Sequence, residues 1–277
     1  MIYMNFLISL HKIGKLAEPA IVMAQIEHYD FQKQVRGLEI NANLEDPLEV
    51  SRLFEYGKLL KSKGMILQLH SPHGFSKLYN ETIKLDAYLS IYNRLAQDFG
   101  QPLSVTIHPV ESHQKEKARY HTLKLITRLH SICELNGYPL TFTLENLNLN
   151  RSRLDTNGIR PIILGSDVNF CWDIGHEVFE NNCSYNIDPN LCANLNNVHI
   201  HDIDQSDHYP FRFDKTDYVK AIEFLYKIRY KQSVVVEINM DYLSGQSWSE
   251  KIMDYISQVY TLSNVYDYLQ AEMGRVI

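Results

Sequence analysis

TFTLE, residues Thr141–Glu145, is a short apolar run that ends in a carboxylate, and the chain repeats its form. Six other runs also end in a residue that can bind a metal ion: RGLEI with Glu39, MILQLH with His70, SVTIH with His108, VNFCWD with Asp173, NVHIH with His199 and His201, and SVVVE with Glu237. Roughly 26 to 38 residues separate each ligand from the next, which is the length of one strand–loop–helix–loop unit. A strand that repeatedly ends in a ligand predicts a parallel barrel with its active site at the carboxyl ends of the strands.

The bulk composition is that of an ordinary globular protein. The chain has 277 residues, of which 45% are hydrophobic and 22% charged, with a net charge of −6. This charge argues against a protein that coats nucleic acid, although it leaves a locally basic cleft open. The four cysteines form no CxxC pair, which favours reduced thiols.

No targeting or membrane segment is expected. The opening MIYMNFLISL lacks the basic region and cleavage site of a signal peptide. No apolar run approaches the ~20 residues of a membrane span. These features predict a cytoplasmic location, and they leave the oligomeric state open.

Strand-like and helix-like segments alternate along the whole chain. The expected strands are Ile2–Ser9, Arg36–Ile40, Met65–His70, Leu103–His108, Leu140–Glu145, Val168–Asp173, Asn197–His201 and Ser233–Glu237. The expected helices are Glu18–Tyr29, Leu48–Lys63, Asn80–Phe99, Gln114–Asn136, Pro189–Leu195, Asp217–Tyr230 and Ser249–Leu269, with a broken candidate at Arg151–Gly165. Eight such units predict one (β/α)₈ TIM barrel over residues 1–277. Neither a dinucleotide-binding nor a P-loop motif is present.

Side-chain parity indicates which face of each strand lines the barrel. Residues two apart on a strand share a face, so Thr141 and Thr143 lie with Glu145, and Thr106 lies with His108. We therefore expect small and polar residues inside the barrel, beneath the ligands, and bulky apolar residues outside, toward the helices.

The possible ligands divide into two sets that share one carboxylate. Glu145, Asp173, His199 and Glu237 can surround one divalent ion. His70 and His108 can supply a second ion, with Glu145 as the bridge. A single ligand-type residue at a strand end is more often a helix cap or a hydrogen-bonded core residue, but the joint pattern favours a metal site. Other histidines are expected at the surface, namely His11, His28, His113, His121 and His130.

At these residues the chain resembles the xylose isomerase-like barrel superfamily, which includes endonuclease IV and many sugar isomerases and epimerases. The matching pieces are RGLEI, LQLHSPHG, TIHPV, TLENL, FCWDIGHEVFE, NVHIHDID, HYP and VVVEIN, in the family's order. They span about residues 36 to 240, and they are specific for the superfamily but not for one reaction.

The resemblance implies metal-binding roles for particular residues. His70 and His108 resemble the ligands of the first site, bridged by Glu145, while Asp173, His199 and Glu237 complete the second. His176 and His208 resemble the histidines of a third site. Endonuclease IV has an aspartate two residues before the last of these, where this chain has Ser206. The resemblance therefore implies one or two ions, zinc or manganese, rather than three.

Three functions remain open at this point. The favoured one is a sugar or sugar-phosphate isomerase or epimerase, in which Glu145 and Glu237 move a proton and His176 orients a substrate oxygen. The alternative is zinc-dependent phosphoester hydrolysis of the apurinic-site endonuclease type, which the histidine pair favours but the lack of a basic, wedge-bearing loop does not. The third is a barrel that binds a ligand without turnover. A small-molecule substrate is thus preferred to nucleic acid, and its expected contacts are Glu39, His73, His201 and Arg212.

Overall fold

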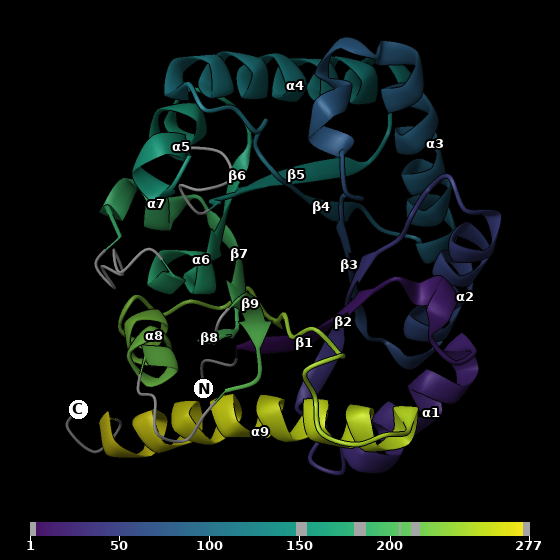
Figure 1. Ribbon diagram of the computed structural model, residues 1–277, viewed down its shortest axis with the longest axis vertical. Coiled ribbons are helices and arrows are strands. Elements are labelled where there is room, and N and C mark those ends of the chain that lie inside the picture. The colour runs from purple at the N-terminus through teal and green to yellow at the C-terminus, as the bar shows by residue number, and fades with distance from the viewer. Residues whose placement is uncertain (1–3, 148–153, 180–186, 205, 212–216, 274–277) are drawn as a thin grey trace.

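The strands close into an all-parallel barrel. The structure, a computed structural model, describes residues 4–147, 154–179, 187–204, 206–211 and 217–273. Eight strands hydrogen-bond in the order β1-β10-β7-β6-β5-β4-β3-β2, and β1 closes the ring on β10 (Figure 1). The strands are β1 (Asn5–His11), β2 (Val35–Asn41), β3 (Ile66–His70), β4 (Leu103–Ile107), β5 (Leu140–Glu145), β6 (Asn169–Asp173), β7 (Leu195–Ile200) and β10 (Ser233–Val236). The predicted (β/α)₈ barrel is confirmed.

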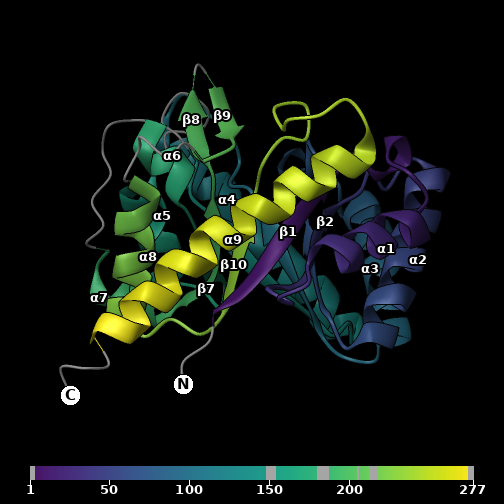
Figure 2. The ribbon, with the colours of Figure 1, turned by 90° about the horizontal axis from the view of Figure 1, so that it is seen from below.

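Helices surround the barrel on its outside (Figure 1). They are α1 (Pro19–Tyr29), α2 (Pro47–Lys63), α3 (Thr82–Phe99), α4 (Lys115–Asn136), α5 (Thr156–Leu164), α6 (Ile174–Phe179), α7 (Pro189–Ala193), α8 (Asp217–Lys227) and α9 (Trp248–Met273), with short 3₁₀ turns η1 (Ile13–Lys15) and η2 (Phe75–Asn80). An antiparallel hairpin, β8 (Asp202–Asp204) and β9 (Ser206–Tyr209), stands at the end of the barrel where α9 begins (Figure 2).

Local sequence signals explain where these helices start and stop. In α2, Asp46 caps the first turn by accepting a hydrogen bond of 2.9 Å from the backbone N–H of Leu48, and Pro47 occupies the first helical position. Gly64 ends the helix at φ 65°, a left-handed conformation that glycine adopts without steric cost.

The barrel interior is polar and its outer layer is apolar, as parity predicts. Phe142 and Leu144 are buried on the helix-facing side of β5. On the inner face, the Thr143 hydroxyl donates to Thr106 over 3.1 Å, and Thr106 donates to Glu39 over 3.1 Å. A buried polar group requires a partner, so this network satisfies polar side chains that would otherwise destabilise the core.

Several element boundaries differ from the expectation. Strand β1 continues two residues beyond Ser9, and α7 ends at Ala193 because β7 already begins at Leu195. The hairpin β8–β9 is not among the expected strands. Of the broken candidate at 151–165, the described part contains α5, with Pro161 inside it. No helix among the described residues is long and apolar enough to cross a membrane.

Candidate metal centre

The predicted ligands converge at the carboxyl ends of the barrel strands. His70, Glu145 and Asp173 are the last residues of β3, β5 and β6, and Glu237 directly follows β10. His70, Glu145, Asp173, His199 and Glu237 are all buried. Because parallel strands end at the same rim of the barrel, residues far apart in sequence meet there.

Glu145 lies between the His70–His108 pair and His199. Its Oε2 atom is 3.2 Å from His70 Nε2, 3.3 Å from His108 Nε2 and 3.5 Å from His199 Nδ1. The Nδ1 atom of His70 lies 2.9 Å from the backbone oxygen of Ser71 and holds a proton there, so Nε2, which hydrogen-bonds Glu145 in the metal-free protein, is the nitrogen that an ion would bind. One carboxylate is thus placed to bridge two ions.

A second group surrounds His199. Its Nδ1 atom lies 2.8 Å from Glu237 Oε2, while its Nε2 atom lies 3.1 Å and 3.2 Å from the two oxygens of Glu39. An Nε2–H bond to Glu39 leaves Nδ1 free to bind a metal, which is the carboxylate–histidine–metal arrangement of many metal sites. Asn146 holds Asp173 nearby, since its side chain accepts from the Asp173 N–H at 2.7 Å and donates to the Asp173 backbone oxygen at 2.9 Å.

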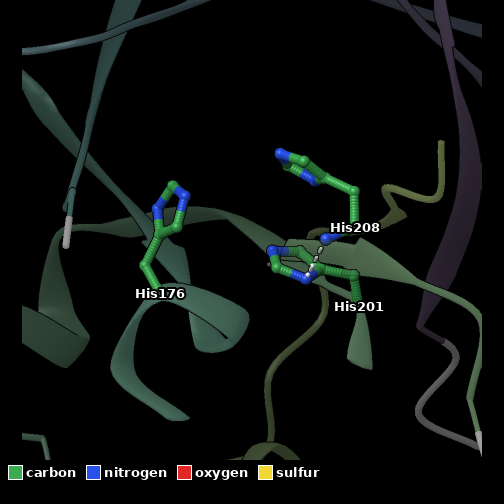
Figure 3. Close-up of side chains that lie close together, drawn as sticks. All are labelled: His176, His201 and His208. Atoms are coloured by element: carbon green, nitrogen blue, oxygen red, sulfur yellow. Dashed lines mark hydrogen bonds between the residues drawn. The ribbon is translucent and has the colours of Figure 1, made fainter. Parts of the chain in front are cut away.

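A third group of side chains comes from α6 and the loop and hairpin after β7. His176, His201 and His208 offer nitrogen atoms that lie within 4.8 Å of one another (Figure 3). Asp207 Oδ2 lies 3.8 Å from Nε2 of His176 and 3.8 Å from Nε2 of His208. The chain thus places an aspartate beside these histidines although Ser206 occupies the position that the endonuclease IV pattern assigns to it.

The side chains fit divalent ions. Among the described residues, several buried ligand atoms have no hydrogen-bond partner, namely His176 Nε2, His199 Nδ1, His201 Nε2, Asp173 Oδ2 and Glu237 Oε2. Atoms bound to one zinc ion at about 2.1 Å lie about 3.0 to 3.4 Å apart, close to the separations around Glu145 and His199. Buried groups without partners at such spacing are the donor set that a cation requires.

Opposite charges shift the pKa values around Glu145. Burial alone would raise the pKa of Glu145, but His108 and His199 hold it well below its ordinary value. Burial lowers the pKa of His70, yet the hydrogen bond to Glu145 and the charge of Glu39 raise it to about 9. The imidazole therefore carries a proton that a metal ion would displace.

The third group is not uniform in its protonation. Burial lowers the pKa of His176, but the negative charges of Asp173 and of the nearby Asp207 raise it to about 10. For His208, burial is the largest cause and lowers the pKa to about 4. His208 is thus neutral at physiological pH, the form in which histidine binds a metal.

Of the residues that were expected to contact the substrate, one lines the cavity and two are buried. His73 is exposed and lines a cavity of about 160 Å³ above the ligands, together with His70, His108, Glu145, His176 and Glu237. The expectation for Glu39 needs correction, because this residue is fully buried beneath the ligands and bonds His199. His201 is also buried and lies 3.3 Å from Asp173. Arg212 lies outside the described residues.

His11 lies beside the candidate metal centre and not, as expected, at the surface. His11 ends β1, and its Nε2 atom lies 3.3 Å from Glu237 Oε1 and 3.0 Å from the Ser9 hydroxyl. The error arose because the strand was expected to end at Ser9. Parity contained the signal, since His11 is two residues from inward-facing Ser9. His28 and His113 are exposed as expected, whereas His121 and His130 are half-buried.

Comparison with known proteins gives similarity in fold. No protein-family profile matches the sequence, and no curated protein matches it. D-psicose 3-epimerase from Clostridium cellulolyticum H10, with D-tagatose, is 13% identical, with 95% of this chain and 99% of that chain covered and a TM-score of 0.71. The 3-keto-D-glucoside 4-epimerase from E. coli is 14% identical, covering 94% and 100%, with a TM-score of 0.66. Endonuclease IV from Thermus thermophilus is 13% identical, covering 95% and 99%, with a TM-score of 0.57.

The motifs and these neighbours agree on the class of fold. The chain has the (β/α)₈ TIM-barrel fold, as do the similar structures of sugar epimerases and endonuclease IV. All three neighbours are enzymes, and their identities of 13 to 14% leave the reaction of this chain open.

Proposed function

We propose that the chain is a metal-dependent phosphoester hydrolase with two ions bridged by Glu145. The observation that carries this proposal is the position of Glu145 Oε2, between the His70–His108 pair at 3.2 and 3.3 Å and His199 at 3.5 Å. A carboxylate shared by a histidine pair and by a second set of one histidine and further carboxylates suits a pair of divalent ions such as zinc, which would stabilise the attacking and leaving oxygens of a phosphoester.

Each group of residues has a distinct part in this chemistry. His70, His108 and Glu145 would hold one ion, and Glu145, Asp173, His199 and Glu237 would hold the other. Bound there, divalent ions supply Lewis acidity and lower the pKa of the attacking water. Glu39 and Asn146 position His199 and Asp173 through the hydrogen bonds described above. His11 lines the cavity beside Glu237 and is placed to pass a proton to the leaving oxygen.

This proposal reverses the preference drawn from the sequence. The isomerase interpretation rested partly on Ser206, which left the third set of ligands without an aspartate. In the structure Asp207 lies 3.8 Å from both His176 and His208. The third set of ligands therefore has an aspartate beside it, and Ser206 no longer counts against the hydrolase. A one-ion isomerase also requires no metal ligand at His70 or His108, although both histidines contact Glu145.

A sugar epimerase is the second candidate, and a specific observation favours it. Glu145 and Glu237 lie 3.5 Å and 2.8 Å from the same nitrogen of His199, so a one-ion centre with two carboxylates is complete without the histidine pair. Two carboxylates beside one ion can remove and return a proton at a sugar carbon. The net charge of −6 also suits a small substrate better than a nucleic acid.

One set of assays separates these candidates. Zinc- or manganese-loaded protein would be tested on bis(p-nitrophenyl) phosphate, on a duplex with an abasic site, and on D-fructose for conversion to an epimer. We expect phosphodiester hydrolysis that falls by on the order of 10³-fold in Glu145→Gln. The matched control is Glu134→Gln, which changes an exposed glutamate on α4 and leaves the rate unchanged. Epimerisation without any hydrolysis would refute the proposal in favour of the second candidate.

A further inference from the structure

A second cavity opens beside the candidate metal centre. It has a volume of about 480 Å³, and it shares His11 and His208 with the smaller cavity above the ligands. Its remaining walls come from the segment after β1, the segment after β10 and the first residue of α9, Trp248. A substrate whose reacting group lies at the metal centre therefore has room to extend past His11 into this larger space.

Two lysines line this cavity without ion-pair partners. Lys12 and Lys15 are exposed, and neither forms an ion pair with any residue that the structure describes. The lining also contains one carboxylate, Asp241, so the two ammonium groups outnumber it. The cavity is thus locally positive in a protein whose net charge is −6.

The backbone that carries the lysines is held in place and strained. The buried Arg52 guanidinium donates to the backbone oxygens of Ile13 at 2.8 Å, Gly14 at 3.0 Å and Leu16 at 2.8 Å. Lys12 adopts φ 51° and ψ 46°, a left-handed conformation that costs a non-glycine residue about 1 kcal/mol or more. Such strain persists where the surroundings impose it, and it concentrates at binding sites.

A second strained residue faces the same cavity. His208 has φ 62°, and it lines both cavities. The described residues contain two further non-glycine residues with positive φ, Lys33 and Arg229, and neither lines this cavity. Strained backbone on two sides of one cavity is independent of the charge observation and also indicates a ligand.

We propose that the cavity lined by Lys12 and Lys15 binds a second anionic group of the substrate, a phosphate about one sugar unit from the reacting phosphoester. The proposal rests on the proposed function for the position of the reacting group. Trp248 and Leu16 supply an apolar wall against which the carbon face of a sugar can pack, and the two ammonium groups meet the phosphate beyond it. The volume suits a sugar bisphosphate, so we favour a small phosphorylated carbohydrate over a nucleic-acid strand.

Binding without turnover tests this proposal. Calorimetry on zinc-loaded protein would compare the non-hydrolysable bisphosphonate analogue of D-fructose 1,6-bisphosphate with the monophosphonate analogue of D-fructose 6-phosphate, because either compound can place one phosphate mimic at the zinc. We expect the second phosphonate to tighten binding about tenfold in the wild-type protein, and the double variant Lys12→Gln/Lys15→Gln to lose that gain. The control is Lys115→Gln/Lys117→Gln, which removes two exposed charges on α4, on the opposite side of the barrel from α9 (Figure 1).

The outcomes are distinct from those of the hydrolysis assay. An equal gain from the second phosphonate in the wild type and the Lys12→Gln/Lys15→Gln variant would overturn the proposal, as would no gain in either. A single-stranded thymidine tetranucleotide distinguishes the source of the phosphate: lysine-dependent binding of this oligomer, with no gain for the bisphosphonate, would overturn the preference for a small carbohydrate. A lysine-dependent gain without any hydrolysis would uphold this site and refute only the proposed reaction.

Discussion

At the scale of single residues, the orientation of His199 depends on Glu39, a carboxylate that was expected to contact the substrate. Glu39 is fully buried, and both of its oxygens lie within 3.2 Å of His199 Nε2. The Glu39 carboxylate accepts a hydrogen bond from His199 Nε2, so His199 Nδ1 faces Glu237 and is the nitrogen that a metal ion would bind.

Replacing Glu39 by Gln should therefore weaken metal binding without removing a ligand. We expect a loss of zinc affinity of about 10- to 100-fold, because the amide holds the imidazole less firmly and lowers its basicity. Competition with a chromogenic chelator measures this affinity. The exposed Glu134→Gln on α4 serves as the control, and unchanged zinc affinity in Glu39→Gln would show that Glu39 does not position His199.

Most candidate ligands could be recognised at this scale because each lies at the end of a strand or within one residue of it. Parity placed Glu145 on the inner face with Thr143, and both are buried there. The roles of three residues were not predicted, for separate physical reasons. His11 follows a strand whose end was set too early, Asp207 lies in a hairpin with no apolar period, and Glu39 lies two residues before the end of β2 and so sits deeper in the barrel.

At the scale of elements, α6 depends on a glycine that makes room for His201. A Cβ atom on Gly175 would lie 2.0 Å from His201 Cε1, far inside van der Waals contact. Gly175 lies between Asp173 and His176, so a side chain there would push the His201 ring against one candidate ligand and shift the helix that carries another.

We expect Gly175→Ala to destabilise the protein by about 2 kcal/mol and to weaken metal binding. The double variant Gly175→Ala/His201→Ala removes the clashing ring, so it should recover much of the stability that the single variant loses. Urea unfolding of the wild type, Gly175→Ala, His201→Ala and the double variant gives the four free energies of unfolding that this double-mutant cycle needs. Strictly additive losses would mean that the two residues do not compete for the same space.

At the scale of the whole molecule, the barrel was predictable because one pattern recurs through the chain. Apolar runs that end in ligands, spaced by one strand–helix unit, leave few folds other than a closed parallel barrel. The segments between strand ends and helices were less predictable. Short polar segments such as β8–β9 have no periodicity of their own, and their structure depends on tertiary contacts such as the hydrogen bond of 2.9 Å from the Asn239 N–H to the His208 oxygen.

The stability of the metal-free protein should depend on pH through its buried histidines. The folded state raises the pKa of His70 to about 9 and that of His176 to about 10. A raised histidine pKa contributes stability that is complete below the unfolded value of about 6.5 and is lost as pH rises toward the folded value. The lowered pKa of Glu145 adds stability that is constant over this range.

His70 and His176 together lose about 4 kcal/mol of stabilisation between pH 6 and pH 8, while the lowered pKa of His208 contributes in the opposite sense, about 1 kcal/mol. We therefore expect the free energy of unfolding to fall by about 3 kcal/mol over this range in the presence of a chelator. Zinc should remove this dependence, because the ions replace the protons. Urea unfolding at several pH values, with chelator and with zinc, provides the comparison. Stability that rises with pH in the chelator series would contradict these protonation states.

The central claim is that Glu145 bridges two metal ions, and anomalous diffraction at the zinc edge from zinc-grown crystals tests it most directly. We expect two strong peaks on either side of the Glu145 carboxylate, one beside His70 and His108 and the other beside Asp173, His199 and Glu237. Only the first peak should disappear in His108→Ala crystals. A single peak in the wild-type protein, within the Glu145, Asp173, His199 and Glu237 set, would contradict the bridged centre and favour a one-ion epimerase.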